Sequence, residues 1–294
     1  MLYKFNTDAD FYIGKTHHIC QDYAAHGFLH DDWSPFIVLS DGCSSSQKTD
    51  IGARILTSSL IKAMGRLNAN EPFAGEWCFS KMALEDANIA CNILKLPQEC
   101  LDATLLYAMM INDFECALTC FGDGVLVKIR NDDFIEIVKI EYPSGAPLYL
   151  NYSSDQERKR RFIEKYSSRR NITNYDIKNS SKGLITISEY CEDKDSPYTE
   201  FVPIRNYKCV ALFSDGVLSF MKRMAGQTSV YNEPMNFIDI ILEMLAFKSY
   251  NGEFVKRRIQ KFRKYCEENN IFNIDDVSMA AIHIEKEEIP DIVA

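Results

Sequence analysis

Short apolar runs that end at polar turns recur along the chain. Residues 36–42 (FIVLSDG) and 210–216 (VALFSDG) repeat one design, in which four apolar residues lead into Ser-Asp-Gly. Apolar runs of this length with polar breaks are typical of buried strands. Similar runs lie at residues 104–111, 115–121, 125–129, 134–140 and 279–284. Because only short polar breaks separate the four runs between residues 104 and 140, the pattern predicts an antiparallel meander there.

Segments with apolar residues at helical spacing lie between the strand runs. Residues 51–64 show this spacing, and we expect further helices over residues 73–94 and 234–269. Strands and helix pairs in this order predict an α+β fold, with two packed antiparallel sheets covered by helices. No internal repeat or clear linker interrupts the sequence, so residues 1–294 are predicted to form a single domain.

The composition narrows the classes of function and location. A chain of 294 residues that is 46% hydrophobic can bury a large core. Its net charge of −9 disfavours nucleic acid as a partner. No apolar run reaches the ~18 residues of a membrane span, and the start of the chain is too polar for a signal peptide. The ten cysteines form no C-x-x-C pair, so a reducing cytoplasm is the expected location.

Aspartates at the ends of predicted strands are the candidate chemical groups. Asp41 and Asp215 lie in the two Ser-Asp-Gly turns. Asp275 lies in residues 274–278 (IDDVS), which lead directly into the last strand, and Asp22 precedes an early apolar segment. Magnesium and manganese prefer oxygen ligands of this kind. However, Asp-Gly is also a common turn dipeptide. The spacing alone therefore leaves both a metal site and plain turns open.

Eight motifs, taken in order, resemble those of a known enzyme family. They are residues 14–17 (GKTH), 20–22 (CQD), 40–45 (SDGCSS), 50–54 (DIGAR), 102–104 (DAT), 122–124 (GDG), 214–216 (SDG) and 275–278 (DDVS). This series resembles the metal-dependent serine/threonine protein phosphatases of the protein phosphatase 2C (PPM) family, in a bacterial-type subgroup. The resemblance implies an α-β-β-α sandwich of two antiparallel sheets flanked by helix pairs. It also implies a variable flap near residues 143–182 and a helical elaboration near 234–269.

The resemblance further implies a centre of two Mn²⁺ or Mg²⁺ ions. Asp41 would bridge the two metals, and the Gly42 carbonyl would bind one of them. Asp215 and Asp275 would bind the other. Asp22 would lie beside the metals as a catalytic group. His17 takes the place of a phosphate-binding arginine, and we expect it to act as a phosphate contact or general acid, or else to be purely structural.

Several residues depart from the family pattern. Gln21 stands in place of a common glutamate, the pair 44–45 (SS) in place of glycines, and Asp276 in place of asparagine. Ser219 stands where an aspartate is common, and no Asp-His motif follows Asp123, which puts a third metal ion in doubt. These departures leave the expected two-metal core intact.

The predicted activity is direct hydrolysis of phosphoserine and phosphothreonine esters by metal-activated water. The partners would be phosphoproteins of a serine/threonine kinase pathway. The alternative is a pseudophosphatase of the same fold that binds a partner without turnover. Cysteine-based phosphatase chemistry is excluded, because no cysteine has an arginine six positions later. Residues 8–10 (DAD) superficially suggest an aspartyl-phosphate enzyme, but we expect an N-terminal loop there.

A basic run, residues 158–161 (RKRR), and the pair 169–170 (RR) lie within the expected flap. Such a run can attract acidic phosphoproteins. It can equally be a solvated helix face.

Overall fold

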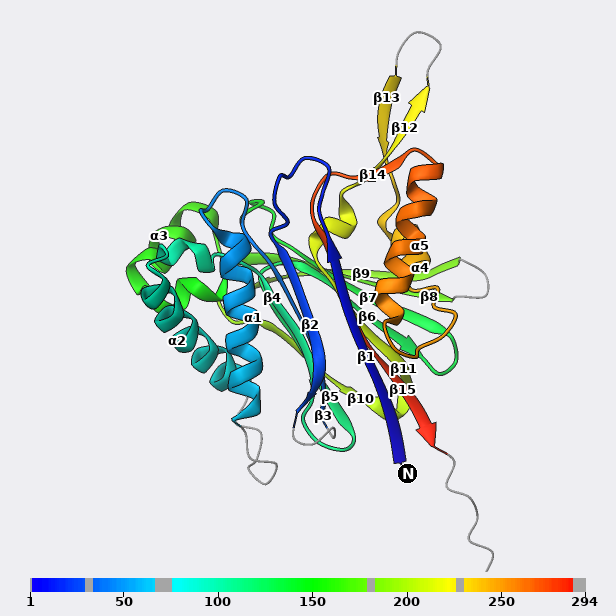
Figure 1. The fold of residues 1–294 in the computed structure, drawn as a ribbon, viewed down its shortest axis with the longest axis horizontal. Helices are drawn as coiled ribbons and strands as arrows, with labels where there is room; N and C mark the ends of the chain where they lie inside the picture. The colour runs from blue at the N-terminus through cyan, green and yellow to red at the C-terminus, as the bar shows by residue number, and fades with distance from the viewer. Residues whose placement is uncertain (1, 30–33, 67–75, 179–182, 226–229, 288–294) are drawn as a thin grey trace, which may run out of the picture.

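The computed structural model describes residues 2–29, 34–66, 76–178, 183–225 and 230–287. Two large antiparallel sheets face each other between helices, as the α+β prediction required (Figure 1). The first sheet has the order β1 (Leu2–Tyr12), β15 (Val277–Glu287), β11 (Tyr207–Phe213), β6 (Gly124–Arg130), β7 (Phe134–Glu141), β8 (Arg169–Lys178) and β9 (Gly183–Asp193). The second has the order β10 (Tyr198–Pro203), β5 (Glu115–Phe121), β4 (Leu105–Met110), β3 (Ser34–Asp41) and β2 (Asp22–Leu29).

Helices cover the outer face of each sheet. In Figure 1, α1 (Thr49–Gly65) and α2 (Glu76–Leu94) flank the five-stranded sheet. Helices α4 (Phe237–Met244) and α5 (Phe254–Glu268) flank the seven-stranded sheet. Three apolar clusters follow from this layering, one under each helix pair and one between the sheets. Burial of these alternating faces is the main stabilising contribution to the sandwich.

Smaller elements surround the sheets. Helix α3 (Gln156–Tyr166) follows the 3₁₀ turn η2 (Leu150–Ser154), and both lie near α2. Strands β12 (Phe220–Ala225), β13 (Val230–Pro234) and β14 (Ile271–Asn273) form a third sheet, from which the β12–β13 hairpin projects (Figure 1). Within the described residues, no helix combines the length and the hydropathy that a membrane crossing needs.

The predicted single meander is wrong in one respect. Its four strands form, but β4 and β5 pair in one sheet whereas β6 and β7 pair in the other. The turn at residues 122–124 carries the chain between the sheets. Gly122 has φ +89° and Gly124 has φ +143°, a backbone conformation that glycine adopts without strain. This crossing places Asp123 at the shared end of both sheets.

The predicted loop at residues 8–10 is also wrong, because these residues lie within β1. The Asp8 carboxylate is buried and accepts hydrogen bonds from the backbone N–H groups of Val255 (2.5 Å) and Lys256 (3.1 Å). Asp8 therefore caps the N-terminus of α5 from a strand that is far away in sequence. A negative charge at this end of a helix also interacts favourably with the helix dipole.

A buried lysine on β6 pairs with carboxylates of both sheets. Lys128 on β6 is only 5% exposed, and its Nζ lies 3.0 Å from Glu136 Oε2 on β7. The same Nζ pairs with Glu200 on β10 of the other sheet. A buried ammonium group is tolerated because two carboxylates surround it.

Candidate metal centre

The first two acidic residues of the site are neighbours across a strand pair. Asp22 begins β2 and Asp41 ends β3, and the two residues face each other in the β2–β3 register. Buried apolar residues fill the interior of β3, which fixes the position of Asp41 at its polar end. The Asp41 N–H donates to Thr104 Oγ1 at 2.9 Å, and the Thr104 N–H donates to the Asp41 carbonyl at 2.8 Å. Strand packing thus positions this pair.

Two serines join the late turn to the first pair. Ser214 Oγ, at the end of β11, donates to Asp22 Oδ2 at 2.7 Å. The Ser214 N–H donates to the Ser278 carbonyl at 3.1 Å, and the Ser278 N–H donates to Ser214 Oγ at 2.9 Å. Asp215 follows directly and opens the 3₁₀ turn η5 (Asp215–Leu218). Strands far apart in sequence therefore bring their acidic ends to one place.

Gly216 permits the closest approach in the site. A Cβ atom built at this position would lie 1.6 Å from the Asp276 carbonyl oxygen. Only glycine allows the two backbones to pack this tightly. The contact brings the segment that carries Asp275 against the turn that carries Asp215.

Two of the residues that depart from the family pattern hold the backbone of the site. Ser219 Oγ accepts the Asp275 N–H at 3.1 Å. The buried Asp276 carboxylate accepts the N–H groups of Gly14 and Gln21, each at 2.6 Å. Asp276 therefore binds the loop at residues 14–21 to the C-terminal strand, with its oxygens occupied by the backbone.

His17 lies between the two adjacent aspartates of the last motif. Its Nε2 is 3.5 Å from Asp275 Oδ1, and its Nδ1 is 3.0 Å from Asp276 Oδ2, although the second contact lacks the alignment of a hydrogen bond. Burial lowers the pKa of His17, but the contact with Asp276 and the nearby negative charges outweigh it, so the net shift is upward. The histidine is thus held at the edge of the acidic cluster.

The electrostatics of the cluster are unfavourable for bare carboxylates. Burial raises the pKa of Asp22 to about 7. Burial, together with the charges of Asp22 and Asp215, raises the pKa of Asp41 well above its ordinary value. Burial and the charge of Asp215 do the same to Asp123, and burial and Asp215 also raise the pKa of Asp275. Carboxylates held this close must bind protons or cations.

Buried carboxylate oxygens without hydrogen-bond donors indicate that the cluster is suited to cations. Asp22 Oδ1 and Asp215 Oδ1 are buried, and neither has a hydrogen-bond donor among the described residues. Asp41 contacts both of these carboxylates. Several carboxylate oxygens without donors form a donor set suited to hard divalent cations such as Mg²⁺ and Mn²⁺. The residues present therefore fit the metal pair that the sequence implied.

All six candidate residues lie at the same end of the sandwich. Gly42 belongs to this group as well, because its N–H donates to the Gln21 carbonyl at 3.2 Å and it forms a β-bridge with Ala103. The site predicted from the sequence did not include Asp123. The signal was present in the Gly-Asp-Gly turn, but only the crossing between sheets places Asp123 where the charge of Asp215 raises its pKa.

Comparisons with known proteins identify the family and the fold of the chain. The family model described as "Protein phosphatase 2C" matches residues 14–262, a range that ends before Asp275. A bacterial serine phosphatase structure superposes with a TM-score of 0.57 at 13% identity, covering 97% of this chain and 100% of that one. Serine/threonine phosphatase Stp1 from Staphylococcus aureus gives 0.56 at 14%, covering 96% of each chain. A serine/threonine phosphatase from S. agalactiae gives 0.54 at 13%, covering 96% of this chain and 100% of that one. These identities establish a shared fold, and a search of curated protein sequences gives no match.

Proposed function

Because the chain belongs to the protein phosphatase 2C family, we propose that it hydrolyses phosphoserine and phosphothreonine esters of proteins with the help of two divalent cations. The observation that carries this proposal is the meeting of Asp41, Asp215 and Asp275 around buried oxygens without donors. Strand ends that served only as turns would have no reason to converge, since like charges repel.

The cation-binding residues follow from the placement of the carboxylates. Asp41 lies centrally, in contact with Asp22 and Asp215, and would bridge two ions. The Gly42 carbonyl would complete one ion's ligands, and Asp215 and Asp275 would hold the other. Mn²⁺ or Mg²⁺, when bound, would supply an activated water and positive charge for the phosphoryl oxygens.

Two neighbouring side chains would handle protons. Asp22 is anchored through Oδ2 by Ser214, which leaves Oδ1 free to accept a proton from the attacking water. In the metal-free site burial raises the pKa of Asp22 to about 7, so this carboxylate takes up a proton more readily than an exposed aspartate does. His17, whose pKa the contact with Asp276 raises, would bind a phosphoryl oxygen or protonate the departing Ser/Thr oxygen.

Under this proposal the partners are phosphoproteins produced by a serine/threonine kinase pathway, and the reaction takes place in the cytoplasm. The test is turnover of p-nitrophenyl phosphate and of a phosphothreonine peptide, each with Mn²⁺ and with a chelator. Wild type should turn over both substrates only with Mn²⁺. Asp41→Asn should lower the rate by about a hundredfold or more.

Asp113→Asn provides the matched control, because Asp113 lies in an exposed turn and undergoes the same chemical change. It should keep the wild-type rate. If wild type binds the phosphopeptide and Mn²⁺ produces no turnover, the pseudophosphatase alternative replaces the enzyme.

A further inference from the structure

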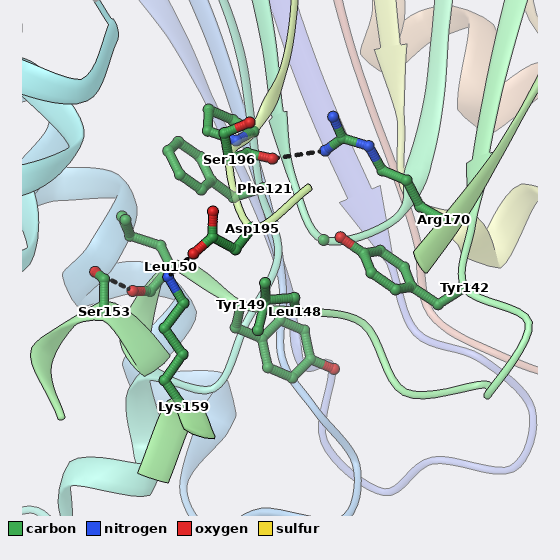
Figure 2. A pocket seen from close by; sticks show the side chains of 12 residues that line it. Phe121, Tyr142, Leu148, Tyr149, Leu150, Ser153, Lys159, Arg170, Asp195 and Ser196 are labelled. Carbon is green, nitrogen blue, oxygen red and sulfur yellow. Dashed lines mark hydrogen bonds and ion pairs between the residues drawn. The ribbon is translucent and has the colours of Figure 1, made fainter. Parts of the chain in front are cut away.

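The basic run on α3 is paired with acidic side chains of the protein itself. Lys159 Nζ lies 2.8 Å from Asp195 Oδ2, a contact visible in Figure 2. Arg160 pairs with Glu157 and Glu164, and Arg161 also pairs with Glu157. Surface pairs of this kind contribute little to stability. They do neutralise the run, which favours the helix-face interpretation over recruitment of acidic substrates.

Arg158 differs from the rest of the run because its partner is buried. Its guanidinium lies 2.5 Å from Asp102 Oδ2, and the Asp102 side chain is only 3% exposed. The guanidinium carbon lies over the ring of Tyr152, 4.6 Å from its centroid, and this contact restricts the orientation of the guanidinium. A buried carboxylate needs such a partner, because an unpaired charge in the interior is strongly unfavourable.

Asp102 gathers two further polar groups. Asn151 Nδ2, from η2, donates to Asp102 Oδ1 at 2.8 Å, and Ser46 Oγ donates to Asp102 Oδ2 at 2.9 Å. Asn151 is fully buried. One carboxylate therefore connects the α3 region on one side with the loop that follows Gly42 on the other.

The backbone around Asp102 frames that same loop. The Cys43 N–H donates to the Asp102 carbonyl at 2.8 Å, and Gly42 bridges to Ala103. Thr104 then binds both backbone groups of Asp41. The short segment at residues 102–104 thus sets where Asp41 and the Gly42 carbonyl lie.

We propose that Arg158 and Asp102 form a clamp that positions residues 41–46 for cation binding. Arg158 is a positioning residue in this scheme, since it acts on the site only through Asp102. This inference rests on the proposed metal centre. It adds that a residue on α3 helps to hold the residues that would bind the cations.

The experiment is a calorimetric titration of Mn²⁺ into the metal-free full chain, with thermal unfolding measured for every variant. Arg158→Ala should weaken Mn²⁺ binding by about tenfold, the lower end for residues that orient metal ligands. Arg158→Lys should recover part of the affinity, because it retains the charge but not the planar guanidinium. The double variant Asp102→Asn with Arg158→Ala should bind Mn²⁺ no more weakly than whichever single variant has the lower Mn²⁺ affinity, because both substitutions remove the same interaction.

Arg161→Ala is the control, since this residue is on the same helix, is exposed and pairs only with Glu157 among the described residues. It should bind Mn²⁺ as wild type does. Folded Arg158→Ala and Arg158→Lys proteins with wild-type Mn²⁺ affinity would overturn the clamp.

Hydrogen exchange at the Cys43 amide separates failure of the clamp from failure of the metal centre. This amide donates to the Asp102 carbonyl, so the clamp predicts faster exchange in Arg158→Ala and unchanged exchange in Arg161→Ala. If wild type binds no Mn²⁺, the metal centre fails, and Cys43 exchange still decides whether Arg158 positions the loop. Exchange that is equal in wild type and Arg158→Ala counts against the clamp. Where Arg158→Ala does not fold, Arg158→Lys and Asp102→Asn serve for both measurements.

Discussion

Replacing Asp41 with asparagine should stabilise the metal-free protein and abolish its response to manganese. The reason is charge repulsion in the acidic cluster, where Asp41 contacts both Asp22 and Asp215. Asparagine keeps the shape of the side chain and can donate a hydrogen bond to a neighbouring carboxylate. It therefore removes one negative charge without opening a cavity.

The neighbouring Asp22 shows the scale of the penalty for a buried carboxylate here, because burial raises its pKa from 3.8 to about 7. A shift of about 3 units corresponds to about 4 kcal/mol between the two protonation states. The folded protein holds this proton more tightly than the unfolded chain does. Stability from Asp22 is therefore fully present below about pH 4 and is lost as the pH rises through about 7.

Asp41 carries a penalty of the same kind, since burial and the charges of Asp22 and Asp215 raise its own pKa well above the ordinary value. Removing about half of a penalty on this scale at pH 8 would add about 2 kcal/mol, or roughly 4 °C in Tm for a chain of this size. At a manganese concentration of about 100 times Kd, wild type should gain about 2.7 kcal/mol from binding. The variant should gain little. The order of stability should thus reverse between chelator and manganese.

The assay is thermal unfolding at pH 5 and pH 8, in chelator and in manganese, with Asp113→Asn as the control for an exposed aspartate. In chelator, the advantage of Asp41→Asn should be larger at pH 8 than at pH 5. The reasoning is refuted if the variant is less stable than wild type in chelator at pH 8, or if manganese still raises its Tm.

Other substitutions test the framework around the site. Gly216→Ala should weaken Mn²⁺ binding at least tenfold by calorimetry, because the new Cβ meets the Asp276 carbonyl, whereas Gly65→Ala, with open space around it, should not. Asp8→Ala should lower the free energy of unfolding in urea by about 1–2 kcal/mol, since α5 loses its cap; an unchanged midpoint would contradict that role. Lys128→Met should lower it by about 2–3 kcal/mol, because Glu136 and Glu200 are half-buried and lose the ammonium group that pairs with both.

Much of the architecture follows from local pattern. The strand-end aspartates were predictable, because an apolar run that stops at Ser-Asp-Gly fixes both the strand and the polar residue at its end. The pairing of β5 and β6 with different sheets was not predictable, because a Gly-Asp-Gly turn serves equally well within one sheet or between two. Hence Asp123 stayed outside the predicted site.

Side-chain contacts between residues far apart in the chain could not be predicted from the sequence, for another reason. Asp8 and the N-terminus of α5 are 247 residues apart, and nothing in the local pattern of β1 indicates a cap. Arg158 and Asp102 are 56 residues apart, and a run of four basic residues does not reveal that one of them is held by a buried carboxylate. Such contacts depend on how the layers pack.

The most direct test is anomalous diffraction from crystals of the full chain grown with Mn²⁺. Two manganese peaks beside the Asp41 carboxylate, one of them also bound by Asp215 and Asp275, are the predicted result. Crystals that contain manganese elsewhere, or a cluster whose carboxylates bind no metal at saturating Mn²⁺, would contradict the account.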